Sequence, residues 1–151
     1  MQIIYKEIDK DLLEKMIAHF GEEDLIRSHI HFEDGSFSLA ALCDDVPVGF
    51  ISIYTEQFTP PLCEHKDVMI AIIEVDENYR RQGIGRGLVT LSEEWALKNG
   101  FTQIRAWSSQ DKIEAIPMWH KLGYCICPAK IWVEWCKEVV DGYYVVKPLK
   151  N

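Results

Sequence analysis

A turn rich in glycine and arginine, set between an apolar run and an amphipathic stretch, constrains the fold of this chain more than any other feature. Residues 79–88 read Tyr-Arg-Arg-Gln-Gly-Ile-Gly-Arg-Gly-Leu; the apolar run 69–75 precedes them and the amphipathic stretch 88–98 follows. A strand, a tight turn and a helix in this order bring the unpaired N–H groups and the positive macrodipole of a helix N-terminus to the turn. The pattern therefore predicts an anion site of the kind that binds phosphate groups.

The glycines of this turn leave room for a bound phosphate. Gly83, Gly85 and Gly87 place no side chain where a phosphate approaches the backbone, and the neighbouring arginines add fixed positive charge. An ordinary surface turn is the alternative, and the arginines, the glycines and the flanking elements together favour the anion site. A Walker A loop ends in Gly-Lys-Ser/Thr, whereas Arg86 follows Gly85 here. The dinucleotide fingerprint Gly-x-Gly-x-x-Gly requires a glycine where the chain has Leu88.

The spacing Arg80-x-x-Gly83-x-Gly85 resembles the Gln/Arg-x-x-Gly-x-Gly/Ala signature of the GNAT superfamily of N-acetyltransferases, which binds the pyrophosphate of acetyl-CoA. The resemblance implies an α/β (α+β) GNAT fold, with a mixed, mostly antiparallel central sheet of about six to seven strands flanked by about four helices. It also implies the residues that bind acetyl-CoA: Val75, whose backbone aligns the pantetheine, and the turn residues Arg80, Arg81, Gln82, Gly83, Ile84, Gly85 and Arg86.

Residues 115–124 resemble the second GNAT motif, in which Asn-x-x-Ala precedes an aromatic residue and Gly-Phe or Gly-Tyr follows. In that family this helix flanks the pantetheine and the adenine end of the cofactor. The asparagine position is Lys112 here, and the tyrosine that often serves as general acid is Trp119. An indole N–H is no useful proton donor near neutral pH, so the acid role is lost at this position. Trp119 is assigned either to packing against the pantetheine or to the core.

The loss of a general acid is compatible with acetyl transfer from a thioester. General acid catalysis typically contributes about 10²–10⁴-fold where it operates. The leaving group here is a thiolate, and because the pKa of a simple thiol is about 8.5, its expulsion at neutral pH needs little protonic help. Stabilisation of the oxyanion by a backbone N–H near Val75 is then expected to be the larger effect.

Glu74 is the best single candidate for the general base. An alkyl amine has a pKa of about 10.4 and arrives protonated, so a base is needed. In the family, bases on this strand lie a few residues earlier, where this chain has Met69 and Ala71. Glu74 as a solvated or core-edge carboxylate therefore remains an equal alternative. The reserve candidates are Glu64, His65 and Asp67, whereas His120 is expected to lie on the surface.

Composition narrows the class of protein. The chain has 151 residues, 48% of them apolar, which predicts a single globular domain over residues 1–151 without a membrane span. Five scattered cysteines and a start without signal-peptide organisation indicate reduced thiols in a cytoplasm. Cys125 and Cys127 share a face by strand alternation alone, so no metal site is expected. A net charge of −8 argues against nucleic-acid binding. It would attract a cationic amine, although solubility is the simpler reason for it.

The pattern along the chain predicts eleven elements. Strands are expected over residues 2–5, 36–42, 48–54, 67–75, 101–107, 124–126 and 142–146, and helices over 10–20, 22–30, 88–98 and 111–122. Asp9 is the expected N-cap of the first helix, with Leu12, Leu13, Met16 and Ile17 inward. A turn is expected at 44–47. The third helix should direct Leu88, Leu91 and Trp95 inward and Glu93, Glu94 and Lys98 outward. Pro117 implies that the last helix begins later than Asp111.

The resemblance therefore implies a cytoplasmic N-acetyltransferase that uses acetyl-CoA as acetyl donor, without a metal, and transfers the acetyl group directly to a primary amine. A small-molecule amine is the leading acceptor class. A protein or peptide amine and a non-catalytic CoA-binding regulator are the alternatives. The loop 57–65 and the segment 128–140 are expected to wall the acceptor site. Dimerisation is common in the family, and no residue pattern decides whether this chain forms a homodimer.

Overall fold

One mixed sheet of seven strands, in the order β1-β2-β3-β4-β5-β7-β6, organises the chain, and the computed structural model describes residues 2–62 and 67–150. The elements are β1 (Ile3–Glu7), α1 (Lys10–Phe20), α2 (Glu23–His29), β2 (Phe37–Cys43), β3 (Val46–Glu56), β4 (Asp67–Val75), the 3₁₀ turn η1 (Glu77–Tyr79), α3 (Ile84–Lys98), β5 (Gln103–Ser109), the 3₁₀ turn η2 (Gln110–Ala115), α4 (Ile116–Lys121), β6 (Cys125–Val133) and β7 (Glu138–Pro148). Only β4 and β5 pair in parallel among the described strands. The predicted fold class and element order are confirmed.

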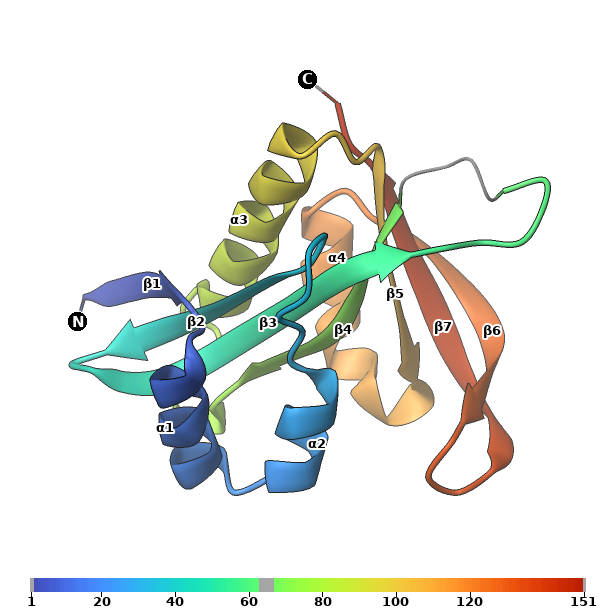
Figure 1. Ribbon diagram of the computed structural model, residues 1–151. Helices are drawn as coiled ribbons and strands as arrows, with labels where there is room; N and C mark the ends of the chain where they lie inside the picture. Colours follow the sequence, from blue (N-terminus) through green and yellow to red (C-terminus); the bar gives the residue numbers. More distant parts are fainter. Residues whose placement is uncertain (1, 63–66, 151) are drawn as a thin grey trace.

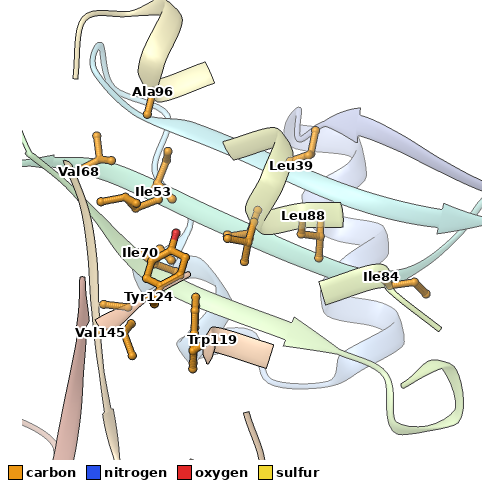
Figure 2. Packing of buried hydrophobic residues seen from close by; sticks show 14 of the residues in the cluster. Leu39, Ile53, Val68, Ile70, Ile84, Leu88, Ala96, Trp119, Tyr124 and Val145 are labelled. Atoms are coloured by element: carbon orange, nitrogen blue, oxygen red, sulfur yellow. The ribbon is translucent and has the colours of Figure 1, made fainter. Parts of the chain in front are cut away.

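The sheet separates two hydrophobic clusters, one under each pair of helices. The helices α1 and α2 cover one face, and α3 and α4 cover the other (Figure 1). Under α3 and α4, strand residues such as Ile53 and Val68 pack against Leu88 and Trp119 from the helices (Figure 2). On the opposite face, Phe50 of β3 is fully buried in the smaller cluster that α1 and α2 cover. In the described part of the chain, no helix is both long enough and apolar enough to cross a membrane.

The predicted cap and inward face of α1 are confirmed. The carboxylate of Asp9 accepts a hydrogen bond from the Leu12 N–H at 2.8 Å, which satisfies one of the free N–H groups of the first turn. Leu12, Leu13 and Met16 are buried. The last helix also begins where Pro117 requires, because η2 fills residues 110–115 and Pro117 lies in the first turn of α4.

The helix α3 begins four residues earlier than the predicted residue 88, at Ile84. Its glycines suggested a turn because glycine is a poor helix former. They lie inside the first turns of the helix because neighbours occupy the space of their side chains. A Cβ on Gly87 would overlap the hydroxyl of Tyr5, and a Cβ on Gly85 would lie 3.2 Å from the Met118 sulfur.

Glu93 is not directed into solvent as predicted. Its carboxylate accepts a hydrogen bond from the Lys147 ammonium at 2.6 Å, and its side chain is 12% exposed. The ion pair joins α3 to β7, whose position helical periodicity cannot reveal. Trp95 is half-buried, as its predicted inward position requires, and stacks between Phe37 and Phe101.

Two hairpins differ from the predicted boundaries. The turn between β2 and β3 consists of Asp44 and Asp45, both with positive φ, so that Val46 and Pro47 already belong to β3. The strands β6 and β7 pair continuously from Cys125↔Val146 to Val133↔Glu138. The segment 128–140 therefore belongs to a β-hairpin, because the pairing partner supplies backbone hydrogen bonds that local propensity does not suggest. Its role as a wall of the acceptor site remains a prediction.

Candidate functional site

A fork between β4 and β5 opens the centre of the sheet. The two strands pair over three positions only, ending at Met69↔Arg105. Beyond this point β4 continues to Val75 and β5 to Ser109, and Figure 1 shows them diverging. Among the described residues, the β4 backbone beyond Met69 pairs with no strand on its β5 side. Because unpaired backbone groups need partners, this edge can bind an extended ligand.

The glycine and arginine turn lies at the open end of this fork. Asp76 closes η1 by accepting the Asn78 N–H at 2.9 Å, and the chain then enters the turn before α3. Arg80 donates from Nε to the Val75 carbonyl at 3.1 Å, which ties the turn to the end of β4. No side chain caps the α3 N-terminus in the described structure. The free N–H groups and the helix macrodipole therefore meet at this end of the fork.

The three glycines of the turn have different structural roles. Gly83 has a φ of 82° as the residue before α3, and a Cβ there would meet no atom within 4 Å. This position needs glycine for its backbone conformation and has open space beside it. Gly85 and Gly87 face Met118 and Tyr5, so Gly87 makes room for a side chain of β1 rather than for a phosphate. Arg81, Gln82 and Arg86 are exposed around the same turn.

Glu74 lies on the side of the sheet that α1 and α2 cover. Its neighbours Ile73 and Val75 pack on the α3 side, so strand alternation directs Glu74 to the opposite face. Partial burial, with the nearby carboxylate of Glu22, raises the pKa of Glu74 to about 7, against the smaller opposing effects of Lys112 and Arg80. The sequence alone could not show Glu22 here, because it comes from the α1–α2 connection. A carboxyl group that titrates near neutral pH can exchange a proton under physiological conditions.

The reserve base candidates separate into two groups. Glu64 and His65 lie outside the described residues. Asp67 is almost fully buried, and its Oδ2 accepts hydrogen bonds from Gln103 at 2.9 Å and from the Arg105 Nε at 2.6 Å. This ion pair fixes Asp67 as a structural anchor across the parallel pair of strands. His120 is exposed on α4, as expected.

Trp119 packs in the hydrophobic core. Its side chain is 4% exposed and meets the ring of Tyr124 edge-on, with ring centroids 4.9 Å apart. Figure 2 shows both rings in the cluster with Ile70 and Val145. These contacts agree with the alternative in which Trp119 belongs to the hydrophobic core. A contact between Trp119 and a bound cofactor remains a prediction.

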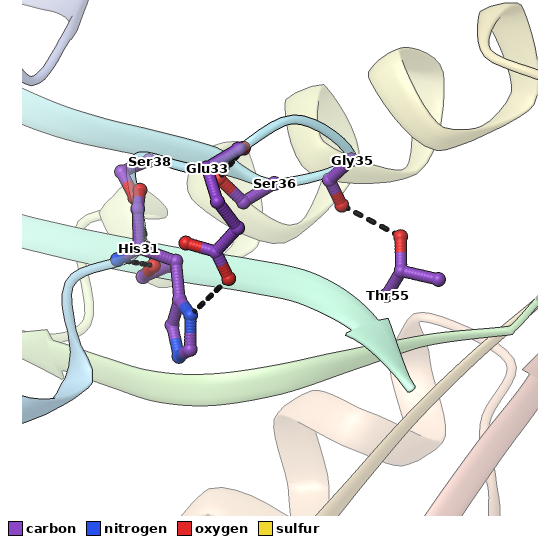
Figure 3. A network of polar contacts seen from close by, with 7 residues as sticks. His31, Glu33, Gly35, Ser36, Ser38 and Thr55 are labelled. Atoms are coloured by element: carbon purple, nitrogen blue, oxygen red, sulfur yellow. Dashed lines mark hydrogen bonds and ion pairs between the residues drawn. The ribbon is translucent and has the colours of Figure 1, made fainter. Parts of the chain in front are cut away.

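Side-chain contacts hold the connection between α2 and β2 against the face of the sheet that carries Glu74. His31 stacks on Tyr54 with ring centroids 4.3 Å apart and shares a 2.7 Å hydrogen bond with Glu33. Thr55 donates to the Gly35 carbonyl at 2.8 Å (Figure 3). Tyr54 pairs with Met69 at the closed end of the fork. These contacts hold the connection beside the fork. No residue of this connection is among the site residues predicted from the sequence.

Known proteins with the same architecture are numerous. The chain is similar to a GNAT-family acetyltransferase from Streptococcus pneumoniae, with 15% identity, a TM-score of 0.71, and 97% of this chain and 99% of that chain covered. It is similar to Arabidopsis thaliana NAA60 in complex with acetyl-CoA, with 16% identity, a TM-score of 0.74, and 98% and 99% covered. It is also similar to the ribosomal-protein-S18-alanine N-acetyltransferase of Escherichia coli, with 15% identity, a TM-score of 0.73, and 99% and 96% covered.

The structural similarities at this low identity establish the fold. No curated protein sequence matches the chain significantly. The model of the acetyltransferase (GNAT) family matches residues 5–124, which include the fork, the turn and the motif around Trp119. The chain therefore belongs to the GNAT family of acetyltransferases.

Proposed function

We propose that this acetyltransferase moves the acetyl group of acetyl-CoA directly to a primary amine of a small molecule. The observation that carries the proposal is the position of the α3 N-terminus at the open end of the β4–β5 fork. A ligand with a phosphate group at one end and an extended chain at the other fits this combination. The phosphate would meet free N–H groups, and the chain would pair with the unpaired edge of β4.

The residues proposed to hold the donor are those around the turn: Val75 through its backbone, and Arg80, Arg81, Gln82, Gly83, Ile84, Gly85 and Arg86 around the pyrophosphate. The open space beside Gly83 supports this assignment. Trp119 would support the strands of the fork through its contacts in the hydrophobic core. Two similar structures support acetyl-CoA as donor. NAA60 was solved with acetyl-CoA. The NatC complex, 13% identical to this chain with a TM-score of 0.72, was solved with CoA and a Gag peptide.

Glu74 is proposed to accept the proton of the acceptor amine through a water molecule. An alkylammonium has a pKa of about 10.4, and a carboxyl with a pKa of about 7 is substantially ionised at neutral pH. Bound acetyl-CoA supplies the thioester carbonyl that the amine nitrogen attacks. Backbone N–H groups on the unpaired edge of β4 would stabilise the negative charge that develops on the carbonyl oxygen. The thiolate leaves without an acid, because a thiol with a pKa of about 8.5 is a good leaving group.

Acetyl-CoA is expected to stabilise the folded protein. A ligand present at about 100 times its dissociation constant adds about 2.7 kcal/mol to the free energy of unfolding. Thermal unfolding with increasing acetyl-CoA should therefore show a progressive rise in Tm, and acetate at the same ionic strength should show none. An unchanged Tm at saturating acetyl-CoA would contradict donor binding at the fork.

The Trp119→Phe variant is expected to retain acetyl transfer within about tenfold of the wild type, because an indole supplies no proton to the leaving thiolate. Its Tm should fall, since the smaller ring leaves part of the space beside Tyr124 unfilled, at a cost of about 1–3 kcal/mol. Activity is measured well below the Tm of the variant. A hundredfold loss of activity in a folded variant would show that the indole contacts the reacting groups.

A peptide amine is the second candidate acceptor. Two structural neighbours favour it: the ribosomal-protein-S18-alanine N-acetyltransferase and the NatC complex bound to a Gag peptide. The two classes are distinguished by the rate of acetyl-CoA consumption. The rate is measured with free amines, including amino acids, and with short peptides that begin with the same amino acids. Faster turnover of peptides would favour the second candidate.

We also propose a cytoplasmic location. The cysteines of the described residues, Cys43, Cys125, Cys127 and Cys136, are free thiols. Free exposed thiols are typical of reducing compartments.

A further inference from the structure

We propose that Arg105 binds a carboxylate of the acceptor, so that the acceptor carries a carboxylate at one end and its amine at the other. This inference rests on the proposed acetyl transfer to a small amine and names the class of that amine. It is carried by the place of Arg105 in the fork, by the contacts that hold its guanidinium, and by the apolar side chains beside it.

Arg105 stands at the closed end of the fork. It forms the last parallel pair with Met69, after which the strands diverge. Its neighbours Ile104 and Ala106 are buried in the cluster under α3 and α4. Strand alternation therefore directs Arg105 to the opposite face, the face that also carries Glu74. Arg105 and Glu74 thus lie on the same face of the sheet. Arg105 lies in β5 at the closed end of the fork, and Glu74 lies in β4 near its open end.

A hydrogen bond from Nε holds the guanidinium of Arg105 in place. Its Nε donates to Asp67, whose side chain is 1% exposed, and the Phe58 ring lies 5.1 Å from the guanidinium carbon. No described residue is seen to accept a hydrogen bond from the two terminal nitrogens, and the Arg105 side chain is 33% exposed. A planar guanidinium whose Nε is fixed, and whose terminal N–H groups meet no acceptor among residues 2–62 and 67–150, matches the two oxygens of a carboxylate.

An apolar surface continues from Arg105 along the same face. Trp107 follows Arg105 by two residues in β5 and pairs with Tyr144 of β7. Both rings are large and exposed, Trp107 by 45% and Tyr144 by 44%. They would contact an apolar spacer between the two charged ends of an acceptor.

The length of the fork agrees with an elongated acceptor. Glu74 follows Met69 by five residues in β4, which is about 16 Å at about 3.3 Å per residue. The Arg105 guanidinium is held toward Asp67, which precedes Met69 in β4, so the side chain of Arg105 does not shorten this span. The carboxylate end of the acceptor would lie at Arg105, its ammonium end would extend along the fork, and water would complete the path to Glu74.

The test compares matched acceptors that differ in the carboxylate alone. These are γ-aminobutyrate and ε-aminocaproate, their amides, and n-butylamine and n-hexylamine, each assayed by release of the CoA thiol. The wild type should prefer the acids over the amides by about tenfold to a hundredfold in kcat/KM, mostly through KM, because charge-assisted hydrogen bonds exceed neutral ones. The Arg105→Gln variant should lose this preference, and Arg105→Lys should retain part of it.

A double variant separates recognition from a counter-ion role. Arg105→Gln leaves the buried Asp67 carboxylate without its charged partner and should lower the Tm, whereas Asp67→Asn with Arg105→Gln removes both charges and should recover the Tm. If Arg105 binds the acceptor, the double variant still shows no preference for the acids. A recovered preference, or equal use of acids and amides by the wild type, would overturn the inference. If no free amine is acetylated although acetyl-CoA raises the Tm, the proposed function itself is overturned.

Discussion

Valine in place of Gly83 is expected to lower the affinity for CoA by at least about a hundredfold. A β-branched residue at a φ of 82° costs about 1–2 kcal/mol of backbone strain, and relief of that strain would move the first N–H groups of α3. Each lost hydrogen bond to a charged phosphate costs about 1.5–3 kcal/mol, and a tenfold change in affinity corresponds to about 1.4 kcal/mol. Titration calorimetry with CoA measures the loss, and circular dichroism checks the fold.

Gly83→Asn is the matched control for this experiment. Asparagine adopts positive φ more readily than other residues with a side chain, and the space around residue 83 is open. The Asn variant should therefore keep the turn and lose much less affinity than the Val variant. Full CoA affinity in a folded Gly83→Val protein would show that the phosphates bind elsewhere.

Glu74→Gln is expected to lower kcat by about 10²–10⁴-fold while CoA affinity stays unchanged, because the amide cannot accept the proton of the acceptor. Wild-type activity should rise with pH through about 7 as Glu74 loses its proton, and the variant should lack this inflection. The pH profile of kcat/KM with a fixed acceptor provides the measurement. An unchanged rate in Glu74→Gln would exclude Glu74 as the base.

Two further observations check the assignment of this inflection. Glu22→Gln removes a charge that raises the pKa of Glu74, so the inflection should move below about 7. The stability of Glu74→Gln provides the second. Because the pKa of Glu74 is raised from 4.5 to about 7 in the folded protein, its stabilising contribution is complete below 4.5 and is lost as the pH rises to about 7. Above pH 7 the variant should therefore be at least as stable as the wild type.

Features that depend on neighbouring residues could be predicted from the sequence. The Asp9 cap, the late start of the last helix at Pro117, and the turn between β4 and α3 each follow from residues within a few positions of one another. Local hydrogen bonds and fixed φ values determine these features, so the printed sequence contains what they require.

The missed features depend on contacts between distant residues. Glu93 meets Lys147 54 positions later, and Asp67 meets Arg105 38 positions later. Such pairs arise only when strands and helices pack, and each partner alone resembles an ordinary surface charge. The carboxylate neighbour of Glu74 comes from the α1–α2 connection for the same reason. The sequence could predict Glu74 as the candidate base. The raised pKa of Glu74 depends on burial and on Glu22, and both arise only in the packed fold.

The contact between Tyr5 and Gly87 couples two positions that lie far apart in the sequence. The Tyr5 hydroxyl occupies the space of a side chain at residue 87, so β1 limits how closely the first turns of α3 approach the sheet. A side chain at residue 87 requires that the Tyr5 ring move or be replaced by a smaller residue. The edge strand β1 thus contributes to the distance between the sheet and the first turns of α3, although it lies outside the β4–β5 fork.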